Sequence, residues 1–223
     1  MLSIDTCGPS GSVALGRLAG SDLEILGETE LAGRTYSAML VSAVSELLAA
    51  NSVSLKDLGG MIVVNGPGSF TGVRVGLSAI KGLAEGLQLP VVAVSRLLVL
   101  AQKACVPSCA LDAHRGEIYL HIDEAGHSPR ELLAGRDELA AVNPTPVCVA
   151  VCDDSAAALL ARAWPSAQLV QCAAPVASDA MRLGETRLVA GRFEDLALLD
   201  GNYLRRSDAE IFGEAAAAGQ KRS

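Results

Sequence analysis

The residues with the clearest chemical potential form a glycine-rich turn between a short apolar run and a long helical pattern. Met61–Val64 predicts a buried strand, and the sequence NGPGSFTG follows it directly. A turn of this kind can hold a phosphate or another anion on the first backbone N–H groups of the next helix. No Gly-Lys-Ser or Gly-Lys-Thr follows it, and the glycine spacing is not that of a dinucleotide-binding fingerprint. The turn therefore matches neither of these two nucleotide-binding loops.

This turn has two interpretations. In one, Ser69 and Thr71 contact an anion or a nucleotide at the start of the helix. In the other, Gly66, Pro67 and Gly68 form a structural turn, and Ser69 or Thr71 caps the helix. We favour the capping interpretation, because the turn lacks the flanking residues of known phosphate loops.

The cysteines and histidines give no metal-binding pattern. Cys148 and Cys152 fall on a predicted strand, where four residues span about 13 Å, so their sulfurs cannot share one zinc ion. Cys105 and Cys109 bracket a turn that has no accompanying histidine pattern. The histidines, which lack helical ligand spacing, are His114, His121 and His127. We expect no metal site and six reduced, buried cysteines.

The composition limits the class of protein. The chain has 223 residues and is half apolar, which suffices for one large domain or for two lobes with separate cores. A net charge of −7 without a basic run predicts negligible tRNA binding by the isolated chain. The sequence contains neither a membrane-span window nor a signal-peptide pattern, so we expect a cytoplasmic protein without membrane contact.

The elements that position these residues alternate in type. Apolar runs and turn signals predict strands at 1–6, 12–18, 23–31, 61–64, 90–94, 148–151 and 168–171. Helical periodicity predicts helices at 36–50, 71–87, 95–104, 155–163 and 179–191, with Ser95 as an N-cap.

An internal repeat indicates two lobes of related fold. Asp5 ends a predicted strand before a tight turn and a second strand, and Asp112 repeats this arrangement more than a hundred residues later. We expect an N-terminal lobe at 1–106, a smaller C-terminal lobe at 107–213 and a flexible tail at 214–223.

Two helices have more apolar surface than one sheet requires. On the helix at 71–87 one stripe carries glycines and apolar residues, and the helix at 36–50 has two apolar stripes and a single charge. We interpret the spare surface as a docking site for a partner, although a helix buried within its own chain is the alternative. The residues assigned to this partner interface are Tyr36, Met39, Leu40, Ala43, Leu47, Gly72, Val75, Gly76, Ala79 and Leu83.

The stretch NGPGSFTGVRVGLSAIKGLA, with IDT near the start and LDAHRGEIYL midway, resembles the bacterial TsaB (YeaZ) family. The resemblance is strong over residues 1–122 and continues weakly to the sequence NYLR at 202–205. It implies an α/β fold of the two-lobed ASKHA type (actin-like ATPase, ribonuclease H-like), with duplicated mixed-sheet lobes flanked by helices. It also implies a non-catalytic dimerisation subunit in the synthesis of threonylcarbamoyladenosine, the modified tRNA nucleoside beside the anticodon.

The same resemblance implies the partners. The chain is expected to pair through its N-lobe helices with a TsaD-type catalytic paralogue, to work with a TsaE-type ATPase, and to meet tRNA only through the complex. It could also form a homodimer when isolated. No cofactor of its own is expected, whereas ATP and a metal ion are expected on the partner proteins.

The sequence departs from the catalytic members of the superfamily. The H-x-x-x-H metal pair of the paralogue is missing from the first helix, where the sequence reads YSAML. Asp5 and Asp112 both lack the following glycine that lets phosphate approach, so we interpret them as residues that close hairpins rather than as magnesium ligands. The alternative function is a stand-alone ASKHA enzyme, either a phosphotransferase or a peptidase.

Overall fold

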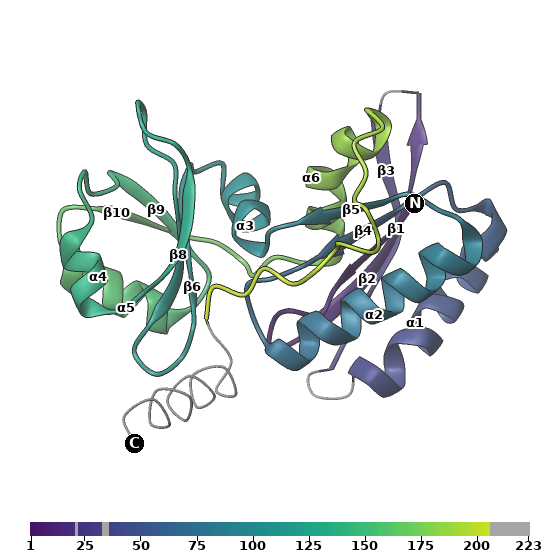
Figure 1. Cartoon of the computed structure of the whole chain (residues 1–223), viewed down its shortest axis with the longest axis horizontal. Coiled ribbons are helices and arrows are strands. Elements are labelled where there is room, and N and C mark those ends of the chain that lie inside the picture. The colour runs from purple at the N-terminus through teal and green to yellow at the C-terminus, as the bar shows by residue number, and fades with distance from the viewer. Residues whose placement is uncertain (21, 33–35, 206–223) are drawn as a thin grey trace, which may run out of the picture.

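The chain forms two five-stranded sheets that lie side by side, each flanked by helices (Figure 1). The computed structural model describes residues 1–20, 22–32 and 36–205. The first sheet contains β1 (Leu2–Asp5), β2 (Gly11–Ala19), β3 (Asp22–Leu31), β4 (Met61–Val64) and β5 (Val91–Val94). The second contains β6 (Ser108–Asp112), β7 (Ile118–Ile122), β8 (Arg130–Ala134), β9 (Cys148–Val151) and β10 (Gln168–Gln171).

The two sheets have the same topology. The first has the order β3-β2-β1-β4-β5 and the second, read in the same direction, β8-β7-β6-β9-β10. In each, the first strand pairs antiparallel with the second and parallel with the fourth. The predicted repeat is therefore a duplicated fold, and the predicted two-lobed, mixed-sheet class is confirmed.

Burial follows the sequence pattern of each strand. Every residue of β1, β4 and β5 is buried, and helices contact the sheet at all three strands. Such strands read as continuous apolar runs, as in the sequence MIVV. Most of β3 is exposed or half-buried, and it lies at the sheet edge.

The helices cover the sheets in a fixed arrangement. On one face of the first sheet lie α1 (Tyr36–Ala50) and α2 (Phe70–Leu87), and on the other lies α6 (Ala177–Val189). Between the sheets lies α3 (Arg96–Ala104), which contacts both α6 and the second sheet. The other face of the second sheet carries α4 (Arg136–Ala141) and α5 (Asp154–Ala163). A 3₁₀ turn, η1, spans Leu55–Asp57.

No helix of the described residues combines the length and the apolar character needed to cross a membrane.

The position of α6 corrects the predicted lobe boundary. We expected 107–213 to form one contiguous lobe, but α6 buries Ala177, Ala180 and Met181 in the core of the first sheet. Periodicity in a sequence identifies an apolar helix face but does not say which sheet will cover it. The second lobe is thus an insertion between α3 and α6, and the predicted tail at 214–223 lies outside the described residues.

After α6 the chain returns across both lobes as an extended strap, residues 194–204, drawn in yellow-green in Figure 1. The Glu194 N–H donates to the carbonyl oxygen of Val91 on the edge strand β5 at 2.8 Å. The Asn202 amide donates to Glu131 Oε2 on β8 at 2.5 Å, and Ser95 Oγ at the start of α3 donates to the other oxygen of the same carboxylate. Glu131 therefore joins the second lobe, the first helix after β5 and the strap.

Candidate functional site

The glycine-rich turn is built as a helix cap. Ser69 is the N-cap of α2, and its hydroxyl accepts a hydrogen bond from the Gly72 N–H at 3.3 Å. The Ser69 N–H donates to the carbonyl oxygen of Cys7 at 2.9 Å. Gly66 has φ +114°, a conformation that other residues rarely adopt. The hydroxyl of Ser69 is thus used within the chain, whereas Thr71 is exposed beside it.

The buried glycines of α2 allow a close approach by the chain's own backbone. A Cβ at Gly72 would lie 1.9 Å from the carbonyl oxygen of Thr6, and a Cβ at Gly76 would lie 2.5 Å from Thr6 Oγ1. The Thr6 hydroxyl in turn donates to the Gly72 carbonyl oxygen at 2.6 Å. These two glycines therefore serve the contact between α2 and the end of β1, not contact with a partner.

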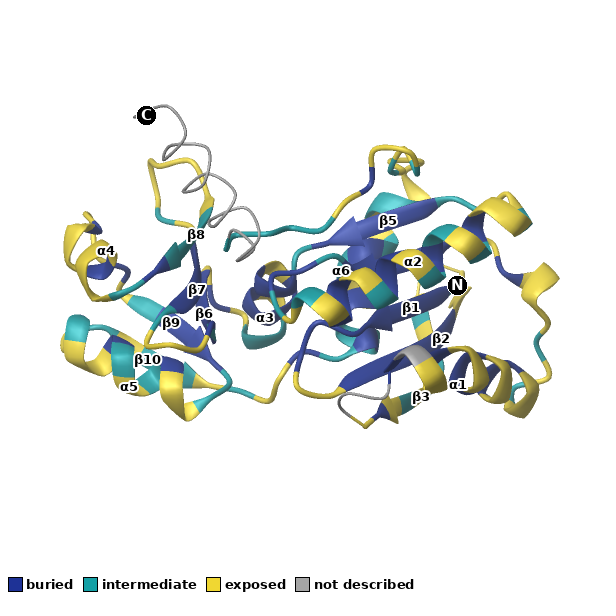
Figure 2. Cartoon of the chain, turned by 60° about the horizontal axis from the view of Figure 1, so that its bottom comes forward, coloured by how far each residue is buried: buried dark blue, intermediate teal, exposed yellow. Residues whose placement is uncertain are grey.

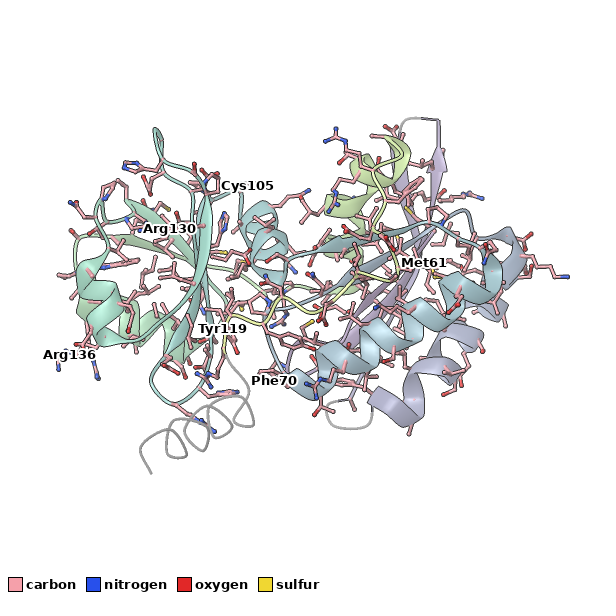
Figure 3. All side chains as sticks on the ribbon, viewed as in Figure 1. Met61, Phe70, Cys105, Tyr119, Arg130 and Arg136 are labelled. Atoms are coloured by element: carbon pink, nitrogen blue, oxygen red, sulfur yellow. The ribbon has the colours of Figure 1, made fainter. Side chains whose placement is uncertain are left out.

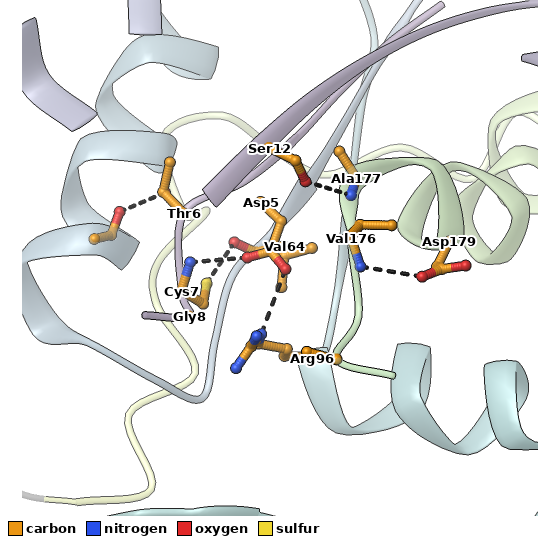
Figure 4. Close-up of polar contacts among 12 residues, drawn as sticks. Asp5, Thr6, Cys7, Gly8, Ser12, Val64, Arg96, Val176, Ala177 and Asp179 are labelled. Atoms are coloured by element: carbon orange, nitrogen blue, oxygen red, sulfur yellow. Dashed lines mark hydrogen bonds and ion pairs between the residues drawn. The ribbon is translucent and has the colours of Figure 1, made fainter. Parts of the chain in front are cut away.

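A buried ion pair closes the first hairpin (Figure 4). Asp5 Oδ1 accepts the Cys7 N–H at 2.8 Å, and Asp5 Oδ2 lies 3.4 Å from Arg96 Nε at the start of α3. The side chains of Asp5 and Arg96 are only 2% and 7% exposed. Both oxygens of Asp5 are therefore used within the chain.

The second hairpin repeats this arrangement. Asp112 Oδ1 accepts the His114 N–H at 2.8 Å, and Asp112 Oδ2 lies 2.8 Å from His114 Nδ1. The Asp112 N–H donates to Asp153 Oδ2 at 3.0 Å. Like Asp5, Asp112 uses both of its carboxylate oxygens in contacts within the chain, and one of them closes its own turn. This agrees with the interpretation of both residues as groups that close their hairpins.

A cleft of about 770 Å³ separates the two hairpins. Its walls come from both lobes, and Figure 3 labels Phe70 on the first and Tyr119 on the second. The charged or polar residues that line it include Ser69, Thr71, Arg96, Asp112, His114 and Arg205. Tyr203 of the strap stacks on Phe70 with ring centroids 5.0 Å apart, and Arg205 pairs with Glu117. The strap thus anchors to both walls beside the cleft.

The structure corrects the predicted partner interface. Six of its residues are buried within the first lobe and are not available to a partner: Tyr36, Leu40, Ala43, Leu47, Gly72 and Gly76. Val75, Ala79 and Leu83 are half-buried, and Met39 is exposed. The reason is that both apolar stripes of α1 face the sheet: Ala43 is 6% exposed and the neighbouring Val44 is 5% exposed.

The outward faces of α1 and α2 carry a different set of residues (Figure 2). On α1 the exposed positions include a stripe of small residues at helical spacing: Ala38, Ser42, Ser45 and Ala49. On α2 a stripe with the same spacing consists of Val75, Ala79, Gly82 and Gly86. A Cβ at Gly82 or Gly86 would meet no atom within 4 Å, so the chain's own packing does not require glycine at either position.

The exposed face of α1 is less polar than its serine residues suggest, because their hydroxyls are hydrogen-bonded within the helix. The hydroxyl of Ser42 donates to the Met39 carbonyl oxygen at 2.9 Å, and that of Ser45 donates to the Val41 carbonyl oxygen at 3.0 Å. Both hydroxyls are thus satisfied by the helix itself. Val41 is 71% exposed, and Glu46 is the one charged residue of α1. The predicted interface included Val75 and Ala79 of the α2 stripe but none of the α1 stripe, because the stronger apolar stripes of α1 led us to assign its buried face instead.

Tyr36 at the start of α1 has a structural role that can be measured. Its hydroxyl donates to the Gly8 carbonyl oxygen at 2.7 Å in a buried contact, and burial together with the nearby Asp5 carboxylate raises the pKa of Tyr36. Tyr36→Phe leaves that carbonyl unsatisfied and should lower the free energy of unfolding by about 1–2 kcal/mol in urea titration. Tyr203→Phe, which keeps the stacked ring, is the control and should be near neutral. Equal losses in the two variants would contradict the role of the hydrogen bond.

The cysteines are all free, but they are not all buried. Cys7 and Cys109 are buried, whereas Cys105 is exposed and the other three are half-buried: Cys148, Cys152 and Cys172. The expectation of six buried cysteines was therefore wrong for four of them. Burial raises the pKa of Cys109 and raises that of Cys152 to about 11, so both remain thiols near neutral pH. Among the residues that the structure describes, no group of three His, Cys, Asp or Glu side chains is placed to hold a metal ion.

Known proteins match this chain in sequence and in fold. A family described as "TsaD: tRNA N6-adenosine threonylcarbamoyltransferase" matches residues 29–131. The tRNA threonylcarbamoyladenosine biosynthesis protein TsaB of Escherichia coli K12 is 36% identical over 125 residues, which are 53% of this chain and 52% of that protein. TsaB of Bacillus subtilis 168 is 35% identical over 123 residues, with 53% and 52% coverage. The chain thus spans about half the length of the curated relatives it matches.

Solved structures extend the comparison over nearly the whole chain. YeaZ from Pseudomonas aeruginosa superposes with a TM-score of 0.72 at 25% identity, covering 91% of this chain and 98% of that one. Component A of the (R)-2-hydroxyglutaryl-CoA dehydratase of Acidaminococcus fermentans superposes with a TM-score of 0.50 at 11% identity, covering 85% and 98%. The second match concerns the fold alone.

The duplicated sheets and the hairpins that face each other across a cleft define a protein with the two-lobed fold of actin-like ATPases, which is a statement about fold and not about activity. Within that class the chain is similar to the TsaB (YeaZ) proteins, in sequence over about half of its length and in fold over nearly all of it.

Proposed function

We propose that this chain is the non-catalytic scaffold subunit of a bacterial complex that transfers a threonylcarbamoyl group to N6 of the tRNA adenosine beside the anticodon. The relatives named as threonylcarbamoyladenosine biosynthesis proteins support the pathway. The match to the TsaD family over residues 29–131 supports a paralogous relation to the catalytic subunit.

The observation that carries the proposal is the outward face of α1 and α2. The neighbouring helices α1 and α2 each carry an outward stripe of small residues with the same spacing. At Gly82 and Gly86 no side chain covers the backbone of α2. Small residues let a second pair of helices approach closely. The occupant we propose is the corresponding pair of helices of a TsaD-type protein, because a paralogue presents a helix pair of the same origin.

The remaining assignments follow from this role. A TsaE-type ATPase completes the complex, and ATP and a metal ion belong to the partner proteins. Contacts to tRNA come from the partner, since this chain carries a net charge of −7. In isolation the same helix face could pair with a second copy of the chain, and the site of action is the cytoplasm.

A stand-alone phosphotransferase receives less support. Such an enzyme needs carboxylates free to act on a metal–phosphate complex between the lobes. Both oxygens of Asp5 and both oxygens of Asp112 are engaged within the chain. The two acids that would serve such chemistry are therefore committed to the hairpins.

Reconstitution tests the proposed role directly. Purified chain, a TsaD-type protein, a TsaE-type protein, threonylcarbamoyl-AMP and unmodified tRNA are combined, and modified nucleoside is measured by mass spectrometry. We expect multiple turnovers only when the chain is present, and no modification or ATP hydrolysis by the chain alone. Multiple turnovers by the TsaD-type protein without this chain would contradict the proposal.

A pair of arginine variants tests the docking face. Ser45→Arg places a charge on the exposed stripe of α1 and should abolish co-elution with the TsaD-type protein in size-exclusion chromatography. Ala161→Arg places the same side chain on the exposed face of α5 in the other lobe and should bind normally. Both variants should keep the circular dichroism of the parent chain, because both sites are exposed. Normal binding by Ser45→Arg would place the docking surface elsewhere.

A further inference from the structure

Two cysteines lie opposite each other where the strands β9 and β10 of the second sheet end (Figure 1). These strands are parallel neighbours, and their register pairs Val151 with Gln171. The Cys172 N–H donates to the Val151 carbonyl oxygen at 2.9 Å, which continues the parallel pairing by one position and places Cys172 beside Cys152. Neighbouring strands lie about 4.8 Å apart. This separation falls within the range of roughly 4.4–6.8 Å between Cα atoms that a disulfide requires.

Both cysteine side chains point to the same face of the sheet. Successive side chains of a strand point to opposite faces. The hydrophobic cluster around α3 contains alternate positions of both strands: Cys148, Ala150, Cys152, Val170 and Cys172. The apolar residues between them belong to the cluster on the other face, with α5. The sulfurs of Cys152 and Cys172, each one bond beyond its Cβ, can therefore meet without movement of the backbone.

The same two sulfurs can be reached from solvent. Cys152 and Cys172 are half-buried, and Cys152 lines the interlobe cleft. The Cys172 thiol donates to the adjacent Ala173 carbonyl oxygen at 3.2 Å in an exposed position, and a thiol is a weak donor that such a contact does not fix in place. Cys7 and Cys109, in contrast, are buried and donate to carbonyl oxygens within the core.

We propose that Cys152 and Cys172 are a reversible modification site, at which a small disulfide such as glutathione disulfide converts the two thiols into an intramolecular disulfide. The Cys172 thiolate attacks one sulfur of glutathione disulfide, which gives a mixed disulfide and releases one glutathione thiolate that takes up a proton. The Cys152 thiolate then attacks the Cys172 sulfur, and the second glutathione leaves. The two protein sulfurs give up two electrons in total, and glutathione disulfide accepts them.

The bond would restrain the segment that joins the two lobes. After Cys172 the chain crosses to α6 in the first lobe, where the Ala177 N–H donates to Ser12 Oγ at 2.7 Å. Directly after Cys152 comes Asp153, the N-cap of α5. A disulfide thus ties the start of the crossing segment to the wall of the interlobe cleft. In a reducing compartment such a bond is transient, so the site responds to the redox state around the protein.

Peptide mapping tests the proposal on the reduced, folded full chain incubated with glutathione disulfide. The buffer is mildly alkaline, because burial raises the pKa of both Cys152 and Cys172 and makes their thiolates scarce near neutral pH. Free thiols are then alkylated, and the peptides are identified by mass spectrometry. We expect a linked pair of peptides containing Cys152 and Cys172, whereas the exposed Cys105 should carry glutathione. The absence of that linked pair at equilibrium overturns the proposal.

Single variants separate this pair from general thiol reactivity. Cys152→Ser should leave Cys172 with glutathione attached and without a protein partner. Cys105→Ser removes an exposed thiol outside the pair and should leave the linked peptides unchanged. Linkage of Cys172 to another cysteine in Cys152→Ser, at the yield seen for the parent pair, would show that the register does not select Cys152 and would overturn the proposal.

Urea unfolding shows whether the bond fits the folded chain. A disulfide that fits the native geometry restrains the unfolded chain and so raises stability. In the Cys105→Ser background the oxidised chain should unfold at a higher urea concentration than the reduced chain, and dithiothreitol should restore the original midpoint. A lower midpoint after oxidation would mean that the strands must distort to form the bond, which overturns the proposal.

Discussion

Gly72→Ala is expected to lower the free energy of unfolding by about 3 kcal/mol or more, the upper range for forcing extra volume into a packed interior. The added Cβ would lie 1.9 Å from the carbonyl oxygen of Thr6, and a backbone atom cannot move aside as a flexible side chain can. The same displacement would break the hydrogen bond from the Thr6 hydroxyl to the Gly72 carbonyl oxygen. Urea titration followed by circular dichroism measures the loss.

Two other glycines of the same helix provide the control. A Cβ at Gly82 or Gly86 enters open space, so alanine there should stabilise the isolated chain by about 1 kcal/mol through helix propensity alone. We expect alanine to stabilise the chain at Gly82 and Gly86 and to destabilise it strongly at Gly72. This result would distinguish a glycine that the chain's own packing requires from glycines that it does not require. Similar effects at all three positions would contradict this division of roles.

Arginine at either Ala43 or Val44 should prevent folding. The two side chains are 6% and 5% exposed, and both belong to the core of the first sheet. An unpaired charge in such a core costs several kcal/mol, a large share of the stability of a domain of this size. If one of the two apolar stripes of α1 instead faced a partner, as the docking interpretation predicts, one of the two variants would stay folded and fail to bind that partner. Circular dichroism and size-exclusion chromatography distinguish the outcomes.

Ser45→Arg is the folded reference for this pair. It lies one position after Val44 and is exposed, so it should melt cooperatively near the temperature of the parent chain. A cooperative melt for Ala43→Arg or Val44→Arg would show that the corresponding side chain does not pack in the core as the structure has it.

Much of the fold could be predicted because the local signals agree with the tertiary structure. Three predicted strands and the helix at Tyr36–Ala50 match the observed bounds, since apolar runs end at turn residues there. The repeated strand–Asp–turn–strand pattern predicted the duplication. The strand Arg130–Ala134 was missed because its sequence, RELLA, is charged and has helix-forming residues.

The direction in which a helix face points could not be predicted in the same way. A helical wheel orders Gly72, Gly76 and Ala79 on one stripe but does not state whether that stripe meets a sheet or a partner. Two adjacent apolar stripes on α1 were interpreted as two contacts, whereas in the structure they form one wide buried face. Only the positions of the neighbouring strands decide between these alternatives.

The ion pair at the cleft floor also escaped prediction. Asp5 and Arg96 are 91 residues apart in the sequence, and no local pattern connects them. A weak signal was present, because Arg96 is the first residue of α3, where the helix dipole disfavours a cation. A cation in that position indicates a compensating carboxylate nearby, although it does not identify which one.

The placement of α6 reverses the order in which the lobes can be completed during synthesis. The strands of the first sheet leave the ribosome first, but one face of that sheet stays uncovered until Ala177–Val189 has been made. The second sheet, from Ser108 to Gln171, needs nothing later in the chain to pair all its strands. The lobe that starts first therefore finishes last, and the sheet face that α6 covers lacks this helix from the synthesis of Val94 until that of Val189.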